Sequence, residues 1–221
     1  MTCKAVLFDL DGTLLDTLED LADSANHALV EMQMPLHPVD AYRYFVGDGM
    51  MTLIERIVPD DRRDPQTIMA TAEAFRRHYT KNWHVKSRPY AGIGEMLTAL
   101  VDAGLQLAIL SNKPQDFTEL CVERLLGDFS FAPVLGQREG IPKKPDPAGA
   151  LEIADILNIA PEKFLYLGDT SIDMQTAGRA GMCAVGVLWG FRTEKELRES
   201  GADHLIQAPS DLLTLLDQAG G

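Results

Sequence analysis

Short apolar runs alternate with helical patterns along most of this chain, and that alternation restricts its fold more than any other feature. Each run is about as long as one strand, and a segment with helical periodicity follows it. Continuous apolar runs of this kind are typical of parallel strands that helices cover on both faces. The pattern therefore predicts a doubly wound α/β domain. The strand-like runs are Lys4–Leu10, Leu105–Leu110, Lys163–Asp169 and Met182–Gly190, and the helical segments include Gln115–Leu126, Ser171–Ala180 and Thr193–Ser200.

One stretch interrupts the alternation soon after the first apolar run. Apolar residues recur at intervals of three and four from about Thr17 to Met34, and two prolines then end the pattern. The segments MMTLIERIV and PQTIMATAEAFRRHYTKNW also have helical patterns, and no convincing strand lies among them. We therefore predict an all-helical insert at residues 16–86. The α/β core would then consist of residues 1–15 and 87–221.

The charge balance limits the class of partner. The 221 residues include 20 Lys and Arg against 33 Asp and Glu, which gives a net charge of −13. Such a surface repels polyanions, so we expect no nucleic-acid partner and no binding to anionic membranes. A small anionic substrate remains possible where a cation or a few placed basic groups offset the charge.

The cysteines and the apolar stretches indicate the compartment. The three cysteines are an odd number and have no metal-binding spacing, which favours buried thiols in a reducing compartment. No secretory signal is visible, and no apolar stretch approaches the ~20 residues of a membrane span. We expect a cytoplasmic protein that is a monomer or a homodimer.

Two carboxylates end the first predicted strand. Asp9 follows the apolar run directly, and Asp11 comes two residues later, so both side chains would point the same way if strand geometry persisted. Gly12 would allow a tight exit from the strand. The alternative is structural: Asp11-Gly12 as a hairpin turn and Asp16-Thr17 as a helix cap.

Three more polar clusters follow later predicted strands. Ser111-Asn112-Lys113 comes after LAIL, a Pro-bounded KKPDP loop spans 143–147, and LGDTSID carries Asp169 and Asp173. Each has a structural alternative: an N-cap, an exposed basic loop, and for Asp173 a favourable place in the first turn of a helix. Ligands of open α/β sheets bind at the carboxyl ends of the strands, so position alone would bring these clusters together.

Together the clusters suit a phosphate and a hard cation. Carboxylate oxygens without His or Cys favour Mg²⁺, which binds through carboxylates, substrate phosphate and water. Ser111 and Lys144 would complete a pocket for a phosphoryl group, because a hydroxyl, backbone N–H groups and an ammonium all bind phosphate oxygens. The repulsion among the carboxylates would then be balanced by the cation.

The four motifs DLDGTLLDT, SNK, KKPDP and GDTSID resemble, in order, those of the haloacid dehalogenase-like (HAD) phosphohydrolases. The helical insert resembles the C1-type cap of that superfamily, and the whole chain is similar to its phosphoglycolate phosphatase-like group. The resemblance implies a Rossmann-like core. It also implies that Asp9 is the nucleophile that forms an aspartyl-phosphate, and that Asp11 protonates the leaving oxygen and then activates water.

The resemblance further implies the ligands. Mg²⁺ would be held by Asp9, the backbone carbonyl of Asp11, and Asp169, with Asp173 orienting the metal shell. The phosphoryl group would lie against Ser111, Asn112 and Lys144, where Lys144 fits the motif better than Lys143 because it directly precedes the proline.

Substrate choice would lie in the cap. By resemblance, the loop Gly47-Asp48-Gly49 faces the catalytic pocket, although it could equally be an ordinary turn between helices. We expect a Mg²⁺-dependent phosphomonoesterase acting on a small metabolite, with 2-phosphoglycolate first. The alternatives are a sugar phosphate such as muramic acid 6-phosphate, pyrophosphate or a nucleotide as substrate; a sugar phosphomutase; a receiver-like module that holds phospho-Asp without turnover; or an inactive relative.

Overall fold

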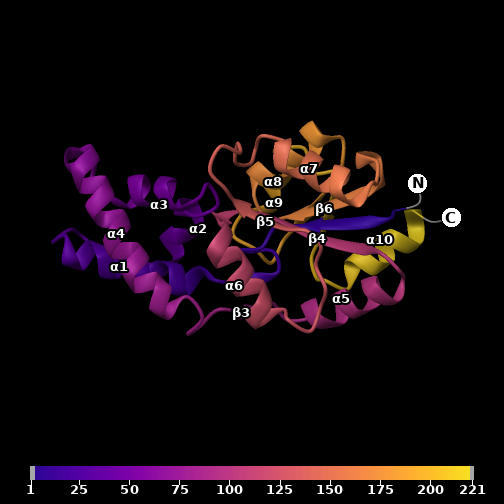
Figure 1. Cartoon of the computed structure of the whole chain (residues 1–221), viewed down its shortest axis with the longest axis horizontal. Helices are drawn as coiled ribbons and strands as arrows, with labels where there is room; N and C mark the ends of the chain where they lie inside the picture. The colour runs from indigo at the N-terminus through magenta and orange to yellow at the C-terminus, as the bar shows by residue number, and fades with distance from the viewer. Residues whose placement is uncertain (1–2, 220–221) are drawn as a thin grey trace. The chain divides into compact units, whose positions relative to one another are not determined.

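The computed structural model describes the backbone of residues 3–219, and this part of the chain forms two compact units (Figure 1). One unit combines the chain up to Leu15 with the chain from Pro89 onward, and the other is Asp16–Arg88. The chain passes between the units twice, at β2 (Leu15–Asp16) and β3 (Arg88–Pro89), and these two short strands pair with each other.

The first unit is built on a six-stranded parallel sheet, as the sequence predicts. Its spatial order is β5-β4-β1-β6-β7-β8, so the chain starts in the middle and winds outward to both edges. Such an order is the doubly wound arrangement, in which the first strand lies at the point where the order reverses. The strands are β1 (Ala5–Phe8), β4 (Gln106–Pro114), β5 (Val134–Gln137), β6 (Phe164–Gly168), β7 (Cys183–Val187) and β8 (His204–Ile206).

Helices cover both faces of this sheet, as its apolar strands require. Figure 1 shows α7, α8 and α9 on one face and α5 and α10 on the other. Small side chains such as Ala150 of α7 and Ala177 of α8 bring their helices close to Phe164 and Tyr166 of β6, which are fully buried. Burying each such aromatic stabilises the fold by about 1.5–3 kcal/mol. The helices are α5 (Ile93–Asp102), α6 (Gln115–Leu125), α7 (Ala148–Leu157), α8 (Ser171–Ala180), α9 (Glu194–Glu199) and α10 (Asp211–Ala219), with a 3₁₀ turn at Pro161–Lys163.

The second unit is helical. Its longest helices, α1 and α4, pack against each other along their apolar faces. α4 begins where the side chain of Asp64 accepts a hydrogen bond from the backbone of Thr67 at 3.0 Å, with a proline in the first turn. The elements are α1 (Leu18–Glu31), α2 (Tyr42–Phe45), α3 (Met50–Ile57) and α4 (Pro65–Asn82), with 3₁₀ turns at Val39–Ala41 and Asp60–Arg62.

Of the pair Asp16-Thr17 considered as a helix cap, Thr17 occupies the N-cap position of α1, and Asp16 does not. Helix α1 starts after Thr17, which makes no side-chain cap hydrogen bond, and the carboxylate of Asp16 lies 3.6 Å from Arg88 instead. The start of α1 is held by Asp20, a buried carboxylate that accepts hydrogen bonds from the backbone N–H groups of Lys86 and Ser87. A buried acid that meets two backbone donors fixes the return segment against α1.

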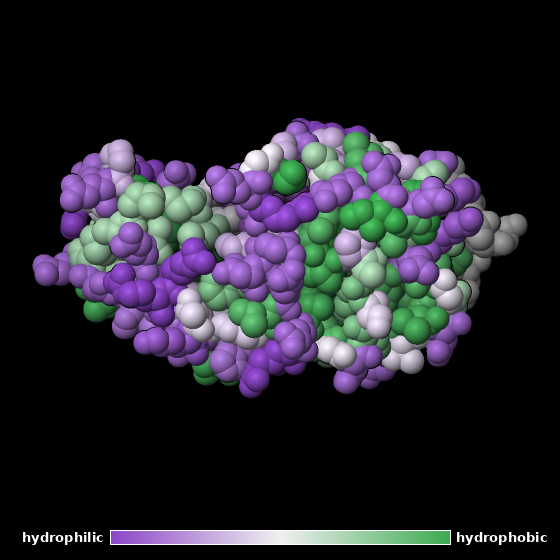
Figure 2. All heavy atoms as spheres, viewed as in Figure 1, coloured by the Kyte–Doolittle hydropathy of each residue, from purple (hydrophilic) through white to green (hydrophobic). Residues whose placement is uncertain are grey.

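Hydrophilic side chains cover much of the visible surface, with a hydrophobic stretch over the unit that carries the sheet (Figure 2). Among the described helices, none has both the length and the apolar composition that crossing a membrane requires. The three cysteines, all within the described residues, form no disulfide with one another.

Candidate active site

Three neighbouring strands deliver acidic and polar residues to one edge of the sheet. Phe8 of β1 is level with Ile109 of β4 and Leu167 of β6. Because these strands are parallel, the residues that follow them emerge at the same edge. Asp9 and Asp169 come directly after β1 and β6, whereas Ser111 lies within β4, which continues past the predicted end at Leu110 as far as Pro114. The three residues start from neighbouring positions, and their side chains are buried.

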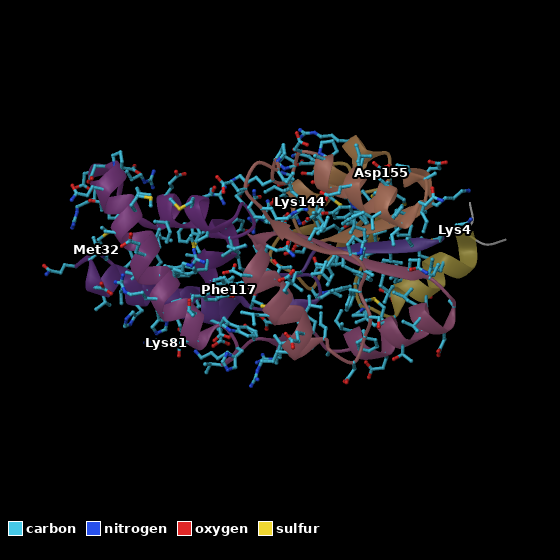
Figure 3. All side chains as sticks on the ribbon, viewed as in Figure 1. Lys4, Met32, Lys81, Phe117, Lys144 and Asp155 are labelled. Atoms are coloured by element: carbon cyan, nitrogen blue, oxygen red, sulfur yellow. The ribbon has the colours of Figure 1, made fainter. Side chains whose placement is uncertain are left out.

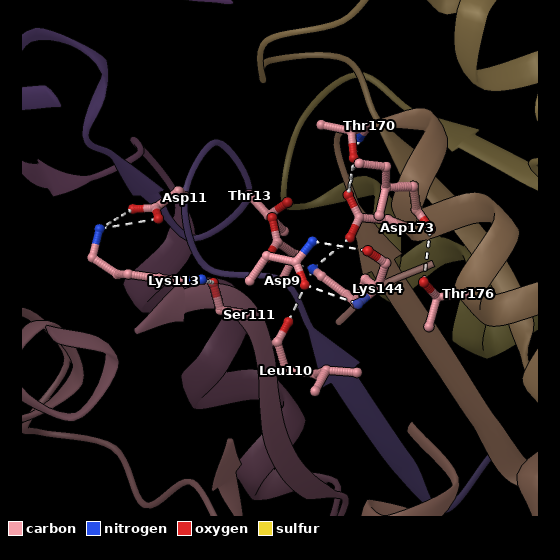
Figure 4. A network of polar contacts seen from close by, with 12 residues as sticks. Asp9, Asp11, Thr13, Leu110, Ser111, Lys113, Lys144, Thr170, Asp173 and Thr176 are labelled. Carbon is pink, nitrogen blue, oxygen red and sulfur yellow. Dashed lines mark hydrogen bonds and ion pairs between the residues drawn. The ribbon is translucent and has the colours of Figure 1, made fainter. Parts of the chain in front are cut away.

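Lys144 lies at the centre of the site. Its Nζ donates hydrogen bonds to Asp9 Oδ1 at 2.7 Å, to Asp173 Oδ1 at 2.7 Å and to the carbonyl of Leu110 at 3.1 Å (Figure 4). An ammonium has three N–H donors, so every donor has a partner. The side chain is 4% exposed, whereas the neighbouring Lys143 is exposed. The structure thus brings the motif lysine, and not its neighbour, to the carboxylates.

The loop that carries Lys144 is held by Asn112. The side-chain amide of Asn112 donates to the carbonyl of Lys144 at 3.1 Å and accepts from its backbone N–H at 2.9 Å. These two bonds aim Lys144 into the interior of its unit, while Asp155 of α7 lies at the margin (Figure 3). Because the amide is engaged at both ends, the side chain of Asn112 holds the loop in place.

Asp169 is held from both sides and is fully buried. Oδ1 accepts from the hydroxyl of Thr13 at 3.3 Å, and Oδ2 accepts from the backbone N–H of Phe191 at 2.7 Å. Gly12 has φ +90°, and a Cβ there would collide with the Asp169 carboxylate and the Phe191 ring. Glycine at this position is therefore required both by the backbone and by the close approach of Asp169.

Asp173 lies in the first turn of α8, as predicted, and has two roles there. Its Oδ2 accepts from the backbone N–H of Thr170 at 3.1 Å and from the Thr170 hydroxyl at 2.7 Å, in a capping box. Its Oδ1 is then left to accept from Lys144. Helix capping and the orientation of the lysine are thus coupled through one carboxylate.

Asp9, Asp169 and Asp173 form a cluster that could hold a metal ion. One oxygen from each lies within 4.8 Å of the others, and all three residues are buried. Asp9 and Asp173 contact the Lys144 ammonium directly, and Asp169 lies beside them. Ionisation of all three carboxylates against this one ammonium leaves the negative charge that one divalent cation would balance. Hard oxygen donors of this kind fit Mg²⁺ or a similar cation.

Burial dominates the electrostatics of the cluster. It raises the pKa of Asp9 to about 7, even though Lys144 acts in the opposite direction. Burial, with the neighbouring Asp9 and Asp173 charges, also raises the pKa of Asp169 well above its usual range. For Lys144, burial would lower the pKa, but the Asp173 and Asp9 carboxylates outweigh it and hold this pKa well above the usual range. Without a metal, the cluster thus favours protons on Asp9 and Asp169.

Strand geometry does not persist as far as Asp11, so the condition under which its side chain would point with that of Asp9 is not met. β1 ends at Phe8, and the turn at Gly12 redirects the chain. The Asp11 carboxylate instead meets Nζ of Lys113, with Oδ1 at 2.9 Å and Oδ2 at 3.0 Å. Figure 4 shows this pair beside the group formed by Asp9, Lys144 and Asp173.

The glycine-bearing loop of the helical unit has a fixed conformation. Gly47 and Gly49 have φ of 113° and 88°, and Asp48 between them lies 2.6 Å from Nη1 of Arg56. The same Nη1 donates to the carbonyl of Phe45 at 3.1 Å. The loop connects α2 with α3, and Arg56 joins it to the helix that follows.

Sequence reasoning missed three contributors to the site. The sequence shows Lys113 only as a member of the SNK cluster. The length of a lysine side chain was the one indication that it could reach Asp11. The backbone N–H of Phe191 donates to Asp169, and the identity of the residue gives no indication of such a contact. Gly190 carries a detectable signal, since it follows a strand end, and a Cβ there would collide with Asp169.

Comparison with known proteins fits this architecture. The family model for haloacid dehalogenase-like hydrolases matches residues 6–187. The phosphoglycolate phosphatase of Aquifex aeolicus is 33% identical over 214 residues, covering 97% of each chain. That of Mesorhizobium japonicum is 35% identical over 201 residues, covering 90% of this chain and 88% of its own.

A solved structure agrees in shape as well. A Haemophilus somnus protein described as a predicted phosphoglycolate phosphatase superposes with a TM-score of 0.91 at 28% identity, covering 97% of this chain and 98% of its own. The chain belongs to the haloacid dehalogenase-like hydrolase family, and within it to the phosphatases of the phosphoglycolate phosphatase-like group.

Proposed function

We propose that this phosphatase hydrolyses a small phosphate monoester through an aspartyl-phosphate on Asp9, with 2-phosphoglycolate as its first candidate substrate. The observation that carries the chemistry is the buried group in which Lys144 contacts Asp9 at 2.7 Å, beside Asp169 and Asp173. The substrate is suggested by the names of the relatives, several of which are phosphoglycolate phosphatases.

The reaction divides into two transfers. An oxygen of Asp9 attacks phosphorus, the bond to the ester oxygen breaks, and Asp11 gives that oxygen a proton. Asp11, now ionised, takes a proton from water, whose oxygen attacks phosphorus and releases inorganic phosphate. Asp9 is then restored as a carboxylate and Asp11 as an acid, so no group is consumed.

The phosphoryl group would be bound by three groups of the core. Lys144 supplies a positive charge next to Asp9, the Ser111 hydroxyl supplies a donor at the end of β4, and the backbone N–H of Asn112 supplies another. Such donors stabilise the charge that develops on the transferring oxygens.

Mg²⁺ would be held by Asp9, Asp169 and the backbone carbonyl of Asp11, while Asp173 orients the metal shell. When bound, it would neutralise charge on the phosphoryl oxygens and on the cluster. Asp169 is prepared for this role because Thr13 and Phe191 fix both of its oxygens.

The helical unit would act as the cap that selects the substrate. We assign that selection to the loop Gly47-Asp48-Gly49, whose conformation Arg56 stabilises from within the same unit. The partner is a small phosphorylated metabolite. The cytoplasmic location and the monomeric or dimeric state stay predictions.

The test is phosphate release from a substrate panel, with and without Mg²⁺, together with Asp9→Asn. The panel holds 2-phosphoglycolate, sugar phosphates, muramic acid 6-phosphate, pyrophosphate and nucleoside monophosphates. We expect Mg²⁺-dependent release that is fastest from 2-phosphoglycolate, and none from the folded Asp9→Asn protein. Release by that variant at the wild-type rate would reject the nucleophile, and a phospho-Asp that persists without phosphate release would favour a receiver-like module.

A further inference from the structure

We propose that Lys113 is a positioning residue for the reaction: its ammonium orients the Asp11 carboxyl group, which carries its proton on one oxygen while the other oxygen accepts from Lys113, for delivery of that proton to the leaving oxygen. The proposal rests on the proposed function, because it presupposes that Asp11 acts as the acid. It gives a task to a buried lysine that phosphate binding and metal binding leave without one.

The contact is made at two points. Nζ of Lys113 lies 2.9 Å from Oδ1 and 3.0 Å from Oδ2 of Asp11, so both carboxylate oxygens meet the same ammonium. A contact of this kind restricts rotation of the carboxylate about its own axis, which a single hydrogen bond would leave open. The side chain of Lys113 is 4% exposed and that of Asp11 is 19% exposed. The lysine of the pair is thus almost fully shielded from solvent, whereas the carboxylate keeps some exposure.

Burial makes the pairing obligatory for the lysine. A buried ammonium without a partner is strongly unfavourable, so Lys113 has little freedom to leave Asp11 in the folded protein. An exposed ion pair of the same length would be loose and would contribute little. The burial of the Lys113 side chain therefore makes this residue a rigid support for Asp11.

The backbone of Lys113 is itself fixed by its neighbours. Its N–H donates to the hydroxyl of Ser111 at 3.2 Å, and its carbonyl accepts from the hydroxyl of Thr118 at 3.1 Å. A Cβ on Gly136 of the adjacent strand would collide with that carbonyl. The pairing of β4 with β5 shifts register between Leu110 and Pro114, and Lys113 lies within this irregular stretch.

The other end of the contact is also anchored. Asp11 lies at the start of a turn in which the N–H of Gly12 donates to the carbonyl of Leu15 at 2.8 Å. Loss of Lys113 would therefore leave the backbone of Asp11 in place and remove the two contacts that orient its carboxyl group. The expected defect is in proton delivery, and not in the binding of phosphate by Lys144 and Ser111.

The experiment separates these roles by the leaving group. An alkyl phosphate such as 2-phosphoglycolate needs a proton on its leaving oxygen, whereas p-nitrophenyl phosphate releases a stable anion. The readout is kcat/KM, because it covers the steps up to phosphoenzyme formation and leaves its hydrolysis out. Should 2-phosphoglycolate prove a poor substrate, the best alkyl phosphate of the panel takes its place.

We expect Lys113→Met to lower kcat/KM for the alkyl phosphate by about 10- to 100-fold, a part of the usual general-acid contribution. For p-nitrophenyl phosphate the loss should stay below about threefold, because that transition state needs little protonation. Lys113→Arg should recover part of the loss. In an Asp11→Asn background, Lys113→Met should add nothing further. Lys195→Met, which removes an exposed lysine from the same unit, is the matched control and should match wild type for both substrates.

Each other result has a defined meaning. Equal losses for the two substrates on Lys113→Met would overturn the proposal, because they would make Lys113 a phosphate-binding or purely structural residue. A selective loss in Asp11→Asn without one in Lys113→Met would overturn the positioning role alone. No selective loss in Asp11→Asn would reject the proposed acid, and the role of Lys113 with it. Circular dichroism checks the fold, and Lys113→Gln, which keeps a polar head, replaces Lys113→Met if the latter does not fold.

Discussion

Nζ of Lys144 lies 2.7 Å from Oδ1 of Asp9, although 135 residues separate the two in the sequence. Both side chains are buried, and neither would be tolerated there alone. The contact therefore joins the end of β1 to the loop after β5. The site can form only when these two parts of the core have come together.

Replacing Lys144 by Met should destabilise the protein more at high pH than at low pH. Removal of one partner from a buried ion pair typically costs about 3–5 kcal/mol, because the other charge stays buried. The pKa of Asp9 is about 7 even with the lysine present, so at pH 5 its carboxyl is protonated and the loss should be smaller. Urea unfolding with a chelator at pH 8 and pH 5 measures the difference. Equal losses at both values would contradict this explanation, and Lys195→Met should change stability at neither.

The metal-free protein should lose stability as the pH rises from about 4 to 7. Burial raises the pKa of Asp9 from 3.8 to about 7, so the folded state binds a proton in this range that the unfolded state has released. Each fully titrating group of this kind lowers the free energy of unfolding by about 1.4 kcal/mol per pH unit. Urea unfolding at several pH values in a chelator measures the slope. Asp9→Asn should reduce the slope of the free energy of unfolding against pH. Some slope should remain, because the pKa of Asp169 is raised as well. An unchanged slope would show that Asp9 is not the group responsible.

Long apolar patterns made the main strands predictable. β1, β6 and β7 are apolar along nearly their whole length because helices cover both faces, and β4 is apolar from Leu107 to Leu110. The predicted helix Ser171–Ala180 is α8 as observed. β5 and β8 are short and mix polar with apolar residues, VLGQ and HLI, so no periodicity marks them. Their place in the sheet is decided by tertiary pairing with β4 and β7.

The candidate site was predictable where topology alone decides it. Asp9 and Asp169 follow β1 and β6, and Ser111 lies in the adjacent β4, so the order of the sheet brings the three together whatever their rotamers. The partner of Asp11 was not predictable, because it depends on where β1 ends and on the register shift in β4. Those are details of backbone geometry at a few residues, and a sequence pattern does not encode them.

Affinity for Mg²⁺ should rise with pH between about 6 and 8. Protons compete with the cation for the cluster, and the pKa of Asp9 at about 7 puts that competition in this range. Isothermal titration calorimetry at several pH values measures the affinity. Asp169→Asn should weaken binding at least about tenfold, because the amide removes a charged ligand whose partners fix it in place. Asp155→Asn removes an exposed carboxylate from α7 and is the control; an equal effect of both variants would mean that only net charge matters.

Replacing Gly12 by Ala should disturb both stability and metal binding. An L-residue at φ +90° is strained by about 1–2 kcal/mol, and its Cβ would also collide with the carboxylate of Asp169. Gly104→Ala provides a matched control, since Gly104 has φ +73° and nothing lies within 4 Å of its added Cβ. The control variant therefore reports the backbone strain alone. We expect Gly12→Ala to lower the free energy of unfolding more than Gly104→Ala does. We also expect it to weaken Mg²⁺ binding, which Gly104→Ala should leave unchanged. The two differences would measure how closely the turn after β1 fits against Asp169. Equal losses in the two variants, with unchanged Mg²⁺ affinity, would mean that Asp169 can move aside and that its position does not depend on the turn.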